Sequence, residues 1–312
     1  MEVSFQQALK NHDLRAIRKV PKSDLHNHSL MGGRLQDLEK FAGRKINRFH
    51  YGKEGIQGIN RWLVEEFRNV IRMPGAFDKA LEAAFLQAKS DGVTVLEMTM
   101  DVGIGKLLNI SSQQIVDSLR NIHQKIAPEI IFRPELGFPR NLPVRTLLAW
   151  FEPFLDLDYF CAIDLYDDEF SQPVKNFREI YAYARSIGMK CKAHAGEFND
   201  AEAVRETIEV LQPDVIQHGI AAASSDDVMK ILAERKIQLN VCPASNIALK
   251  RVKSYKTHPI RILFDHGVKV TVNTDDVLLF NKGNSEQYLQ MYRSGLFNEK
   301  ELDMIRENGL FS

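Results

Sequence analysis

Four histidines stand at the ends of short apolar runs rich in β-branched residues, and two of them are spaced to chelate a metal. His26 and His28, in SDLHNHS, are two residues apart. Side chains two apart on a strand share a face, so both imidazoles can turn to one point. Zn²⁺ takes neutral imidazole and carboxylate ligands, and a catalytic site leaves one position open for water. His194 in KAHAGE and Asp275 in VNTDD complete such a ligand set.

Three further residues lie beside these predicted ligands and suit acid and base chemistry. Glu197 lies three residues beyond His194, on the turn leaving the same run, where its carboxyl can stand beside the metal without ligating it. His218, in IQHG, ends the next run. Asp276 follows Asp275 directly, and consecutive side chains point differently, so one can ligate while the other faces the pocket. Two alternatives stay open: Glu197 could cap the helix that follows, and Asp276 could cap a turn.

Eight β-rich runs alternate with amphipathic helical patterns, and each candidate ligand falls at the carboxyl end of a run. The runs span residues 22–28, 93–98, 130–135, 159–164, 189–194, 214–218, 237–241 and 268–273. Eight parallel strands with crossover helices imply an α/β fold, the (β/α)₈ or TIM barrel, whose active site lies at the carboxyl ends of the strands. A doubly wound open sheet is the alternative, but it would not naturally bring residues of its first and last strands together.

The connection after the first run is unusually long. Residues 44–74 contain a helical pattern that includes Trp62, Phe67 and Val70. Long connections in compact domains are often lids or binding elements, so we predict a helical lid insertion after the first strand. A helix that only extends the outer ring is the alternative. Because no repeat or linker interrupts the sequence, residues 1–312 are expected to form a single domain.

The composition indicates a soluble protein with a small-molecule partner. Among 312 residues, 41 basic side chains balance 41 acidic ones, and no long Lys/Arg block offers an electrostatic footprint for nucleic acid. No run approaches the length of a membrane span, and the N-terminal residues lack the apolar core of a signal peptide. The three cysteines are widely separated, which fits reduced thiols. We therefore expect a cytoplasmic protein without nucleic-acid or membrane partners, while the oligomeric state stays open.

Taken together, the motifs resemble those of the adenosine deaminase family of metal-dependent amidohydrolases. The matches follow the family order over most of the chain: DLHNH, IDLYDDE, AHAGE, QHG, CPASN, HP and NTDD. A lone H-x-H would be weak evidence, whereas the ordered set is specific. The resemblance implies that one zinc ion, with a water in its open position, is held by four ligands, namely His26, His28, His194 and Asp275.

The resemblance also implies hydrolytic deamination of adenosine or a related aminopurine or nucleoside, with release of ammonia. Glu197 would donate a proton to the ring nitrogen, His218 would orient and polarise the water, and Asp276 would accept a hydrogen bond from the purine. Bound Zn²⁺ lowers the pKa of its water to about 7, which makes hydroxide available at neutral pH. Binuclear relatives bridge two metals with a modified lysine after the fourth strand, but AIDLYDDEF has no lysine. One zinc ion per chain is therefore predicted.

Departures from the family pattern bear on the substrate. The family motif H-x-H-L-D-G carries a sugar-binding aspartate, which HNHSLMGGR lacks. Asp167, in DLYDDE, stands where the family has a glycine beside the purine. Arg34 follows two glycines at the start of a helical run, which suits an anion site as well as a plain surface loop. The candidate substrate-binding residues are therefore Gly196, Asp276, Asp167 and Arg34. A different amino-heterocycle or an anionic nucleotide is the alternative substrate.

Two rival functions are weighed against deamination. DLHNHS also resembles the opening of polymerase-and-histidinol-phosphatase-type phosphoesterases, which use several metals, and Glu97 and Glu135 could serve as their acidic ligands. The later motifs HAGE and NTDD have no reason to occur in such an enzyme. The second rival is a barrel that only binds, with a structural metal. A structural zinc site is closed by four ligands, which leaves the neighbouring glutamate, histidine and second aspartate unexplained.

Overall fold

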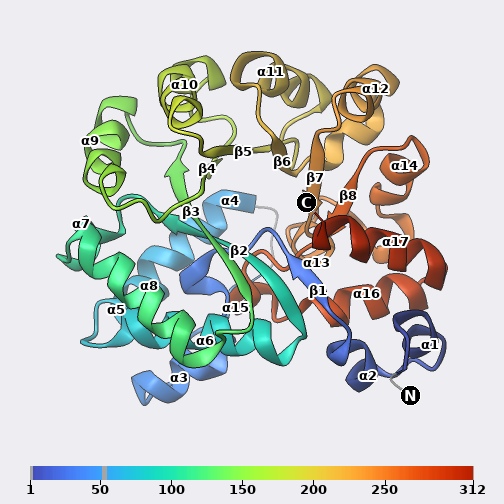
Figure 1. The fold of residues 1–312 in the computed structure, drawn as a ribbon, viewed down its shortest axis with the longest axis horizontal. Coiled ribbons are helices and arrows are strands. Elements are labelled where there is room, and N and C mark those ends of the chain that lie inside the picture. The colour runs from blue at the N-terminus through green and yellow to red at the C-terminus, as the bar shows by residue number, and fades with distance from the viewer. Residues whose placement is uncertain (1–2, 51–54, 312) are drawn as a thin grey trace.

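The computed structural model, which describes residues 3–50 and 55–311, is a barrel of eight parallel strands (Figure 1). The strands pair in chain order. Their bounds are β1 Lys22–Asp24, β2 Val93–Asp101, β3 Ile131–Pro139, β4 Ala162–Tyr166, β5 Lys190–Ala195, β6 Val215–His218, β7 Gln238–Val241 and β8 Val270–Val272. Every predicted run overlaps a strand, so the predicted (β/α)₈ barrel is confirmed.

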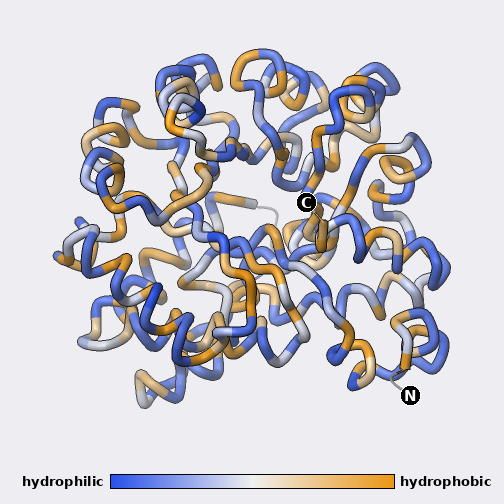
Figure 2. The backbone as a smooth tube through the Cα atoms, viewed as in Figure 1, coloured by the Kyte–Doolittle hydropathy of each residue, from blue (hydrophilic) through white to orange (hydrophobic). Residues whose placement is uncertain are grey.

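Helices surround the strands, and hydrophobic and hydrophilic residues alternate along them, as Figure 2 shows. The α-helices are α1 Phe5–Lys10, α2 Leu14–Lys19, α3 Leu35–Ala42, α4 Gly55–Trp62, α5 Arg68–Ile71, α6 Ala76–Ser90, α7 Ile104–Leu108, α8 Ser112–Ile126, α9 Val144–Leu155, α10 Arg178–Ser186, α11 Ala201–Leu211, α12 Asp226–Glu234, α13 Pro243–Ala248, α14 Ile260–Asp265, α15 Val277–Phe280, α16 Asn284–Arg293 and α17 Glu299–Leu310. Short 3₁₀ turns are η1 Ser29–Met31, η3 Val174–Phe177, η4 Ile220–Ser224 and η5 Tyr255–Thr257.

Asp200 caps α11 by accepting from Ala203 N at 3.0 Å, so Glu197 is not the cap of this helix.

Buried polar side chains close the barrel between β1 and β8. Asp24 accepts Thr274 N at 3.0 Å through one carboxylate oxygen and the Thr274 hydroxyl at 2.5 Å through the other. The Asn284 amide donates to Ser23 O on β1 and to Val272 O on β8, each at 2.8 Å. Since a buried polar group without a partner costs free energy, these bonds specify which strands meet.

The first strand is shorter than predicted. β1 stops at Asp24, before either histidine of the H-x-H motif. Beyond it the backbone stays extended, because Asn27 forms an isolated bridge with Asp275 and His28 forms one with Thr99. The two histidines therefore keep the spacing of a strand while lying outside the hydrogen-bonded ladder.

A buried ionic cluster fills the barrel interior below the carboxyl ends of the strands. The Lys192 ammonium binds the carboxylates of both Glu97 and Glu135, and it donates to Leu25 O at 3.2 Å. Burial alone lowers the pKa of Lys192, but the two carboxylates outweigh burial and raise it. Burial raises the pKa of Glu135 to about 8, so near pH 7 the cluster holds one ammonium against one carboxylate. Glu97 and Glu135 are therefore partners of Lys192.

The long connection after β1 contains α4, a π-helical turn η2 (Leu63–Phe67) and α5; residues 51–54 lie outside the described part of the chain. Trp62, Phe67 and Val70 are buried in a cluster with side chains of α3, α6 and α15. Figure 1 shows α4, α13 and α15 inside the outline of the outer helices. The segment thus packs onto the barrel, and its action as a lid stays a prediction.

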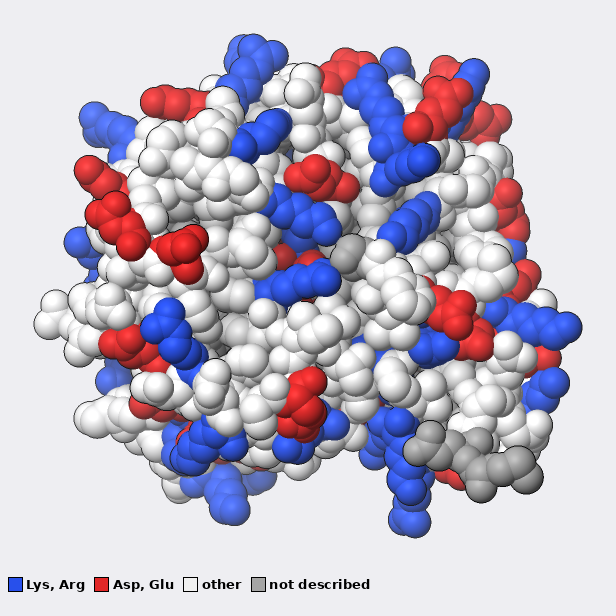
Figure 3. Space-filling model, in the orientation of Figure 1, with Lys and Arg blue, Asp and Glu red and all other residues white. Residues whose placement is uncertain are grey.

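Charged side chains of both signs are interspersed over the face seen in Figure 3. This distribution accords with the formal net charge of zero. Within residues 3–50 and 55–311, no helix combines the length and the apolar character needed to cross a membrane.

The cluster around Lys192 generates a stability prediction. Lys192→Met should lower the free energy of unfolding by about 3–5 kcal/mol at pH 8, because the buried Glu97 and Glu135 carboxyls lose their shared ammonium and, among the described residues, only the partly exposed Arg133 guanidinium, 3.2 Å from Glu97, remains. The loss should shrink toward pH 5, since a buried carboxyl that has lost its ammonium partner has a raised pKa and the fold gains stability as it protonates. Urea unfolding at both pH values measures the change.

Lys190→Met, on the same strand but only partly buried, is the matched control and should change stability by less than about 0.5 kcal/mol. Equal stability of the two variants at pH 8 would contradict the role assigned to the buried cluster.

Candidate active site

Four imidazoles converge at the carboxyl ends of the strands. Neighbouring ring centroids of His26, His28, His194 and His218 are 4.6 to 5.5 Å apart. The ligand nitrogens of the first three lie within 4.8 Å of one another. Asp275 Oδ1 lies 3.8 Å from His26 Nε2 and 3.4 Å from His28 Nε2. The structure therefore brings all four candidate metal ligands to one point.

In His194 and His26, the ring nitrogen Nδ1 has a partner in the protein, which leaves Nε2 available to a cation. His194 Nδ1 lies 3.2 Å from Asp164 Oδ1, and His26 Nδ1 faces Asn240 O at 3.5 Å. His26 Nε2 is buried and has no hydrogen-bond partner among the described residues. Metal-ligating histidines commonly donate their second ring N–H to a carboxylate or carbonyl in this way. Burial and the neighbouring imidazoles lower the pKa of His26 well below its usual range, so the ring is neutral as ligation requires. The site therefore fits a borderline divalent cation such as Zn²⁺.

Glu197 and His218 form a pair beside this ligand set. Glu197 Oε2 lies 3.4 Å from His218 Nε2, and both side chains are buried. The Asn246 amide nitrogen faces His218 Nδ1 at 3.2 Å and Glu197 Oε1 at 3.4 Å. An amide donor at Nδ1 puts the proton of a neutral imidazole on Nε2, directed into the site. Burial and the nearby Asp275 carboxylate raise the pKa of Glu197 well above its usual range.

The turn that carries Glu197 is held by a residue to which the sequence analysis gave no role. The Glu169 carboxylate accepts the backbone N–H groups of Gly196, Glu197 and Phe198 at 2.8 to 2.9 Å. Gly196 has φ +70°, and a Cβ there would lie 2.4 Å from Val204 Cγ2, so a side chain has no room. Gly196 thus shapes the turn, and its backbone N–H is bound to Glu169.

The supporting role of Asp164 was also missed, although this residue stands in a motif quoted above. Asp164 is the second residue of IDLYDDE, which Glu169 closes, and Asn246, a further supporting residue, ends CPASN. Their roles depend on which strand ends are neighbours, since Asp164 on β4 reaches His194 on β5 and Asn246 on α13 reaches β6. In the sequence, the only sign of these roles was that the residues belong to the quoted motifs. The sequence did not show which atoms they would bind.

Three site residues have a left-handed backbone. Asp167, His218 and Asp275 have φ of +79°, +61° and +60°. Such conformations cost non-glycine residues about 1–3 kcal/mol and cluster at functional sites. The strain turns the chain sharply as it leaves β4, β6 and β8, which separates the directions of consecutive side chains such as Asp275 and its successor.

Asp276 is buried and faces the metal-site pocket. It occupies the N-cap position of α15 but makes no side-chain cap bond, so the capping alternative is wrong. Its Oδ1 has no hydrogen-bond partner in the described structure. Burial and the adjacent Asp275 carboxylate raise the pKa of Asp276 well above its usual range. An unpartnered carboxyl oxygen of this kind is available to a ligand.

Asp167 lines the pocket but is already bound to the long connection. Its Oδ1 accepts Asn60 Nδ2 from α4 at 2.9 Å and Asp168 N at 2.7 Å. Burial raises the pKa of Asp167. The carboxylate therefore ties the end of β4 to α4 at the edge of the pocket.

The structure does not bring Arg34 into the site. Its guanidinium donates to Glu286 Oε2 at 2.8 Å, to Gln87 Oε1 at 2.9 Å and to Asn281 Oδ1 at 2.9 Å. Arg34 lines neither the metal-site pocket nor the cavity beside it. Its charge serves the packing of α3 against α6 and α16.

The metal-site pocket is small, about 60 Å³. Its polar wall includes every metal-site and catalytic candidate except His26, and its apolar wall comes from α4, η2 and the C-terminal end of α13, including Ile56, Ile59 and Leu249. Of the four imidazoles, those of His26, His194 and His218 are buried, and that of His28 is partly buried. This burial restricts the access of water to the site.

Known proteins place this arrangement in a family. The sequence matches the adenosine deaminase family over residues 63–312. A putative adenosine/adenine deaminase of Treponema pallidum is 32% identical over 292 residues, covering 94% of this chain and 98% of the relative. Among solved structures, an adenine deaminase of Arthrobacter aurescens superposes with a TM-score of 0.83 at 21% identity, covering 93% of each chain. A zinc-bound amidohydrolase of Burkholderia ambifaria superposes with a TM-score of 0.80 at 23% identity, covering 95% of this chain and 86% of the other.

The resemblance drawn from the motifs is thereby confirmed. The family match covers the carboxyl ends of seven of the eight strands, and the eighth, β1, leads into the H-x-H motif. The chain belongs to the adenosine deaminase family, hydrolases that act on C–N bonds.

Proposed function

We propose that this protein is a hydrolytic deaminase that replaces the exocyclic amine of an aminopurine with oxygen, releases ammonia and uses one zinc ion per chain. The observation that carries the proposal is the convergence of three imidazoles and the Asp275 carboxylate beside a buried pair, Glu197 and His218. Ligands and proton-transfer groups are thus separate side chains. Family membership supports C–N hydrolysis as the reaction.

When bound, zinc would supply the Lewis acidity that makes water nucleophilic at neutral pH. The protein's own groups divide the remaining work. Glu197 is positioned to move a proton to the ring nitrogen next to the attacked carbon, which prevents charge from building there. His218, whose Nε2 lies between the Glu197 and Asp275 carboxylates, would orient the attacking water, and Asp276 offers an unpartnered carboxyl oxygen to the amine or a ring N–H.

The rival functions find less support. A phosphoesterase would need Glu97 and Glu135 as metal ligands, and both are bound to Lys192. A purely structural metal leaves the Glu197 and His218 pair without a purpose. An anionic nucleotide gains nothing from Arg34, whose guanidinium is already paired. We also propose that the protein acts in the cytoplasm, since its three cysteines are all unpaired thiols.

Metal content tests the ligand set. The purified protein should contain close to one transition metal per chain by elemental mass spectrometry, and His194→Ala should lose most of it because one of four ligands is gone. His266→Ala is the control, since this ring is exposed at the end of α14 and its contacts, to Ile262 O and to the exposed Asp226 carboxylate, lie outside the candidate site. Two tightly held metals per chain would contradict the mononuclear site.

Substitution of Glu197 tests whether this residue transfers a proton or holds the metal. Glu197→Gln should keep the metal but lower kcat by about a hundredfold or more, the scale of positioned proton transfer. His218→Ala should behave similarly, and Glu202→Gln, an exposed acid on α11, should change neither quantity. Loss of metal from Glu197→Gln, with activity restored by added zinc, would reverse the assignment.

A double-mutant cycle tests the bond between Asp167 and α4. If Asp167 acts by holding α4 at the pocket, Asp167→Ala and Asn60→Ala should each raise KM by about three- to tenfold, and the double variant should be no worse than either. Steady-state ammonia release measures the cycle. An effect of Asp167→Ala that is much larger than that of Asn60→Ala and adds to it would instead assign Asp167 to the substrate ring.

A further inference from the structure

A larger cavity opens beside the metal-site pocket, and its walls indicate what the substrate carries. The cavity measures about 340 Å³, against about 60 Å³ for the pocket itself. His28, Met31, Leu63 and Tyr166 line both spaces, so the two are adjacent. The combined space lies within the usual range for small-molecule sites, whereas the metal-site pocket alone is below it. A group attached to the reacting ring therefore has this side cavity to enter.

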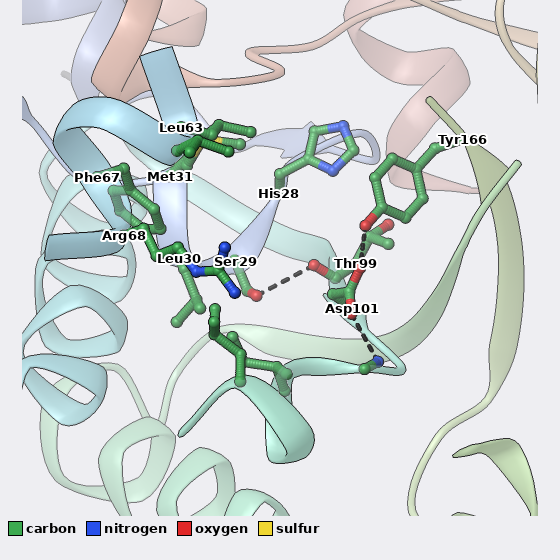
Figure 4. Close-up of a pocket in the computed structure, with 14 residues that line it drawn as sticks. His28, Ser29, Leu30, Met31, Leu63, Phe67, Arg68, Thr99, Asp101 and Tyr166 are labelled. Atoms are coloured by element: carbon green, nitrogen blue, oxygen red, sulfur yellow. Dashed lines mark hydrogen bonds between the residues drawn. The ribbon is translucent and has the colours of Figure 1, made fainter. Parts of the chain in front are cut away.

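The side cavity is apolar on the side that the long connection and the turn after β1 build. Figure 4 shows Leu30, Met31, Leu63 and Phe67 on one side, His28 between, and Thr99, Asp101 and Tyr166 opposite. Ile104 and Leu107 of α7 complete the apolar lining. By direct count, Leu30 stands where the family motif has its sugar-binding aspartate, two residues after the second histidine.

Three polar side chains of the side cavity, Ser29, Asp101 and Tyr166, are already bound within the protein. The Ser29 hydroxyl donates to Thr99 O at 3.0 Å. Asp101 accepts Gly103 N at 2.6 Å through one oxygen, and its other oxygen binds the Tyr166 hydroxyl. A sugar placed here would give up water without gaining equivalent partners for its hydroxyls.

Arg68 is the one cationic residue among those that line the side cavity, and the described structure records no partner for it. Its side chain is exposed on α5, where solvent screens its charge. Arg68 therefore adds little selectivity for a charged group, and the apolar wall sets the character of the cavity.

We propose that the side cavity binds an apolar, uncharged substituent of the substrate, so that the preferred substrate is an aminopurine carrying an alkyl or aryl group in place of a sugar. This inference rests on the proposed deaminase function and narrows its substrate class. Leu30, Met31, Leu63 and Phe67 are the residues that determine this specificity. Each methylene that enters the cavity should raise kcat/KM by about fourfold, the effect of burying one such group.

The test compares ammonia release from adenine, adenosine, 9-methyladenine and 9-butyladenine by the zinc-loaded protein. We expect kcat/KM to rise from 9-methyladenine to 9-butyladenine and to exceed that of adenosine by tenfold or more. If adenine or adenosine is turned over at least as efficiently as 9-butyladenine, the inference is overturned while the deaminase function stands.

If no turnover is detected, calorimetric measurement of product binding tests the cavity assignment separately from the deaminase function. 9-Butylhypoxanthine should bind at least tenfold more tightly than inosine, whatever the activity. Equal or weaker binding overturns the inference. Tight binding of 9-butylhypoxanthine without ammonia release from any of the four aminopurines would uphold the cavity assignment and overturn the deaminase function.

Two substitutions localise the effect. Leu30→Asp should raise the kcat/KM ratio of adenosine to 9-butyladenine by at least tenfold, because it supplies a partner for sugar hydroxyls. Leu107→Trp narrows the cavity from α7 and should lower the kcat/KM ratio of 9-butyladenine to 9-methyladenine about tenfold. This variant replaces Leu30→Asp in the test if Leu30→Asp fails to fold. Leu86→Asp, on the exposed side of α6, is the control and should leave both ratios unchanged. Unchanged ratios in a folded Leu107→Trp overturn the inference.

Discussion

The closure of the barrel between β1 and β8 is the constraint on which the site depends. Three of the four candidate metal ligands come from the two ends of the chain, since His26 and His28 follow β1 and Asp275 follows β8. The strands have no continuous ladder there, so buried side-chain bonds from Asp24 and Asn284 do the joining. These bonds set the approach of Asp275 Oδ1 to the imidazoles, and an open sheet with the same strands would separate them. Stability at this seam and metal binding are therefore coupled.

Inside the barrel, several charged side chains are placed against defined partners. The interior ammonium of Lys192 is matched by carboxylates, and the Asp164 and Glu169 carboxylates accept from a ring nitrogen and from backbone N–H groups. By contrast, His26 Nε2 and Asp276 Oδ1 are buried without partners in the described structure. Other buried polar atoms also lack partners, but only these two belong to candidate site residues that converge with His28, His194 and Asp275, so they are the atoms that a cation and a substrate could complete.

The sequence predicted the barrel and its strands because hydrophobic periodicity and the ordered motifs are local signals. It predicted the candidate ligands for the same reason, through H-x-H, HAGE and NTDD. It did not predict that β1 ends before His26, since that boundary depends on how the barrel closes. It also missed the roles of Asp164 and Glu169, which are set by neighbouring strands. Arg34 shows the converse: a glycine-rich turn suggested an anion site, but Glu286, 252 residues later in the chain, pairs with the guanidinium.

The long connection after β1 contributes both to covering the site and to selecting the substrate. Leu63 of this segment lines both the metal-site pocket and the side cavity, Phe67 lines the side cavity, and Asn60 binds Asp167 at the pocket edge. A substituent that fills the side cavity therefore packs against the same helices that cover the reacting ring. Binding energy from a group remote from the amine can then hold those helices over the site and restrict water there. On this view two departures from the family pattern are linked. The loss of the sugar-binding aspartate makes the side cavity apolar, and Asp167 anchors the segment that lines this cavity.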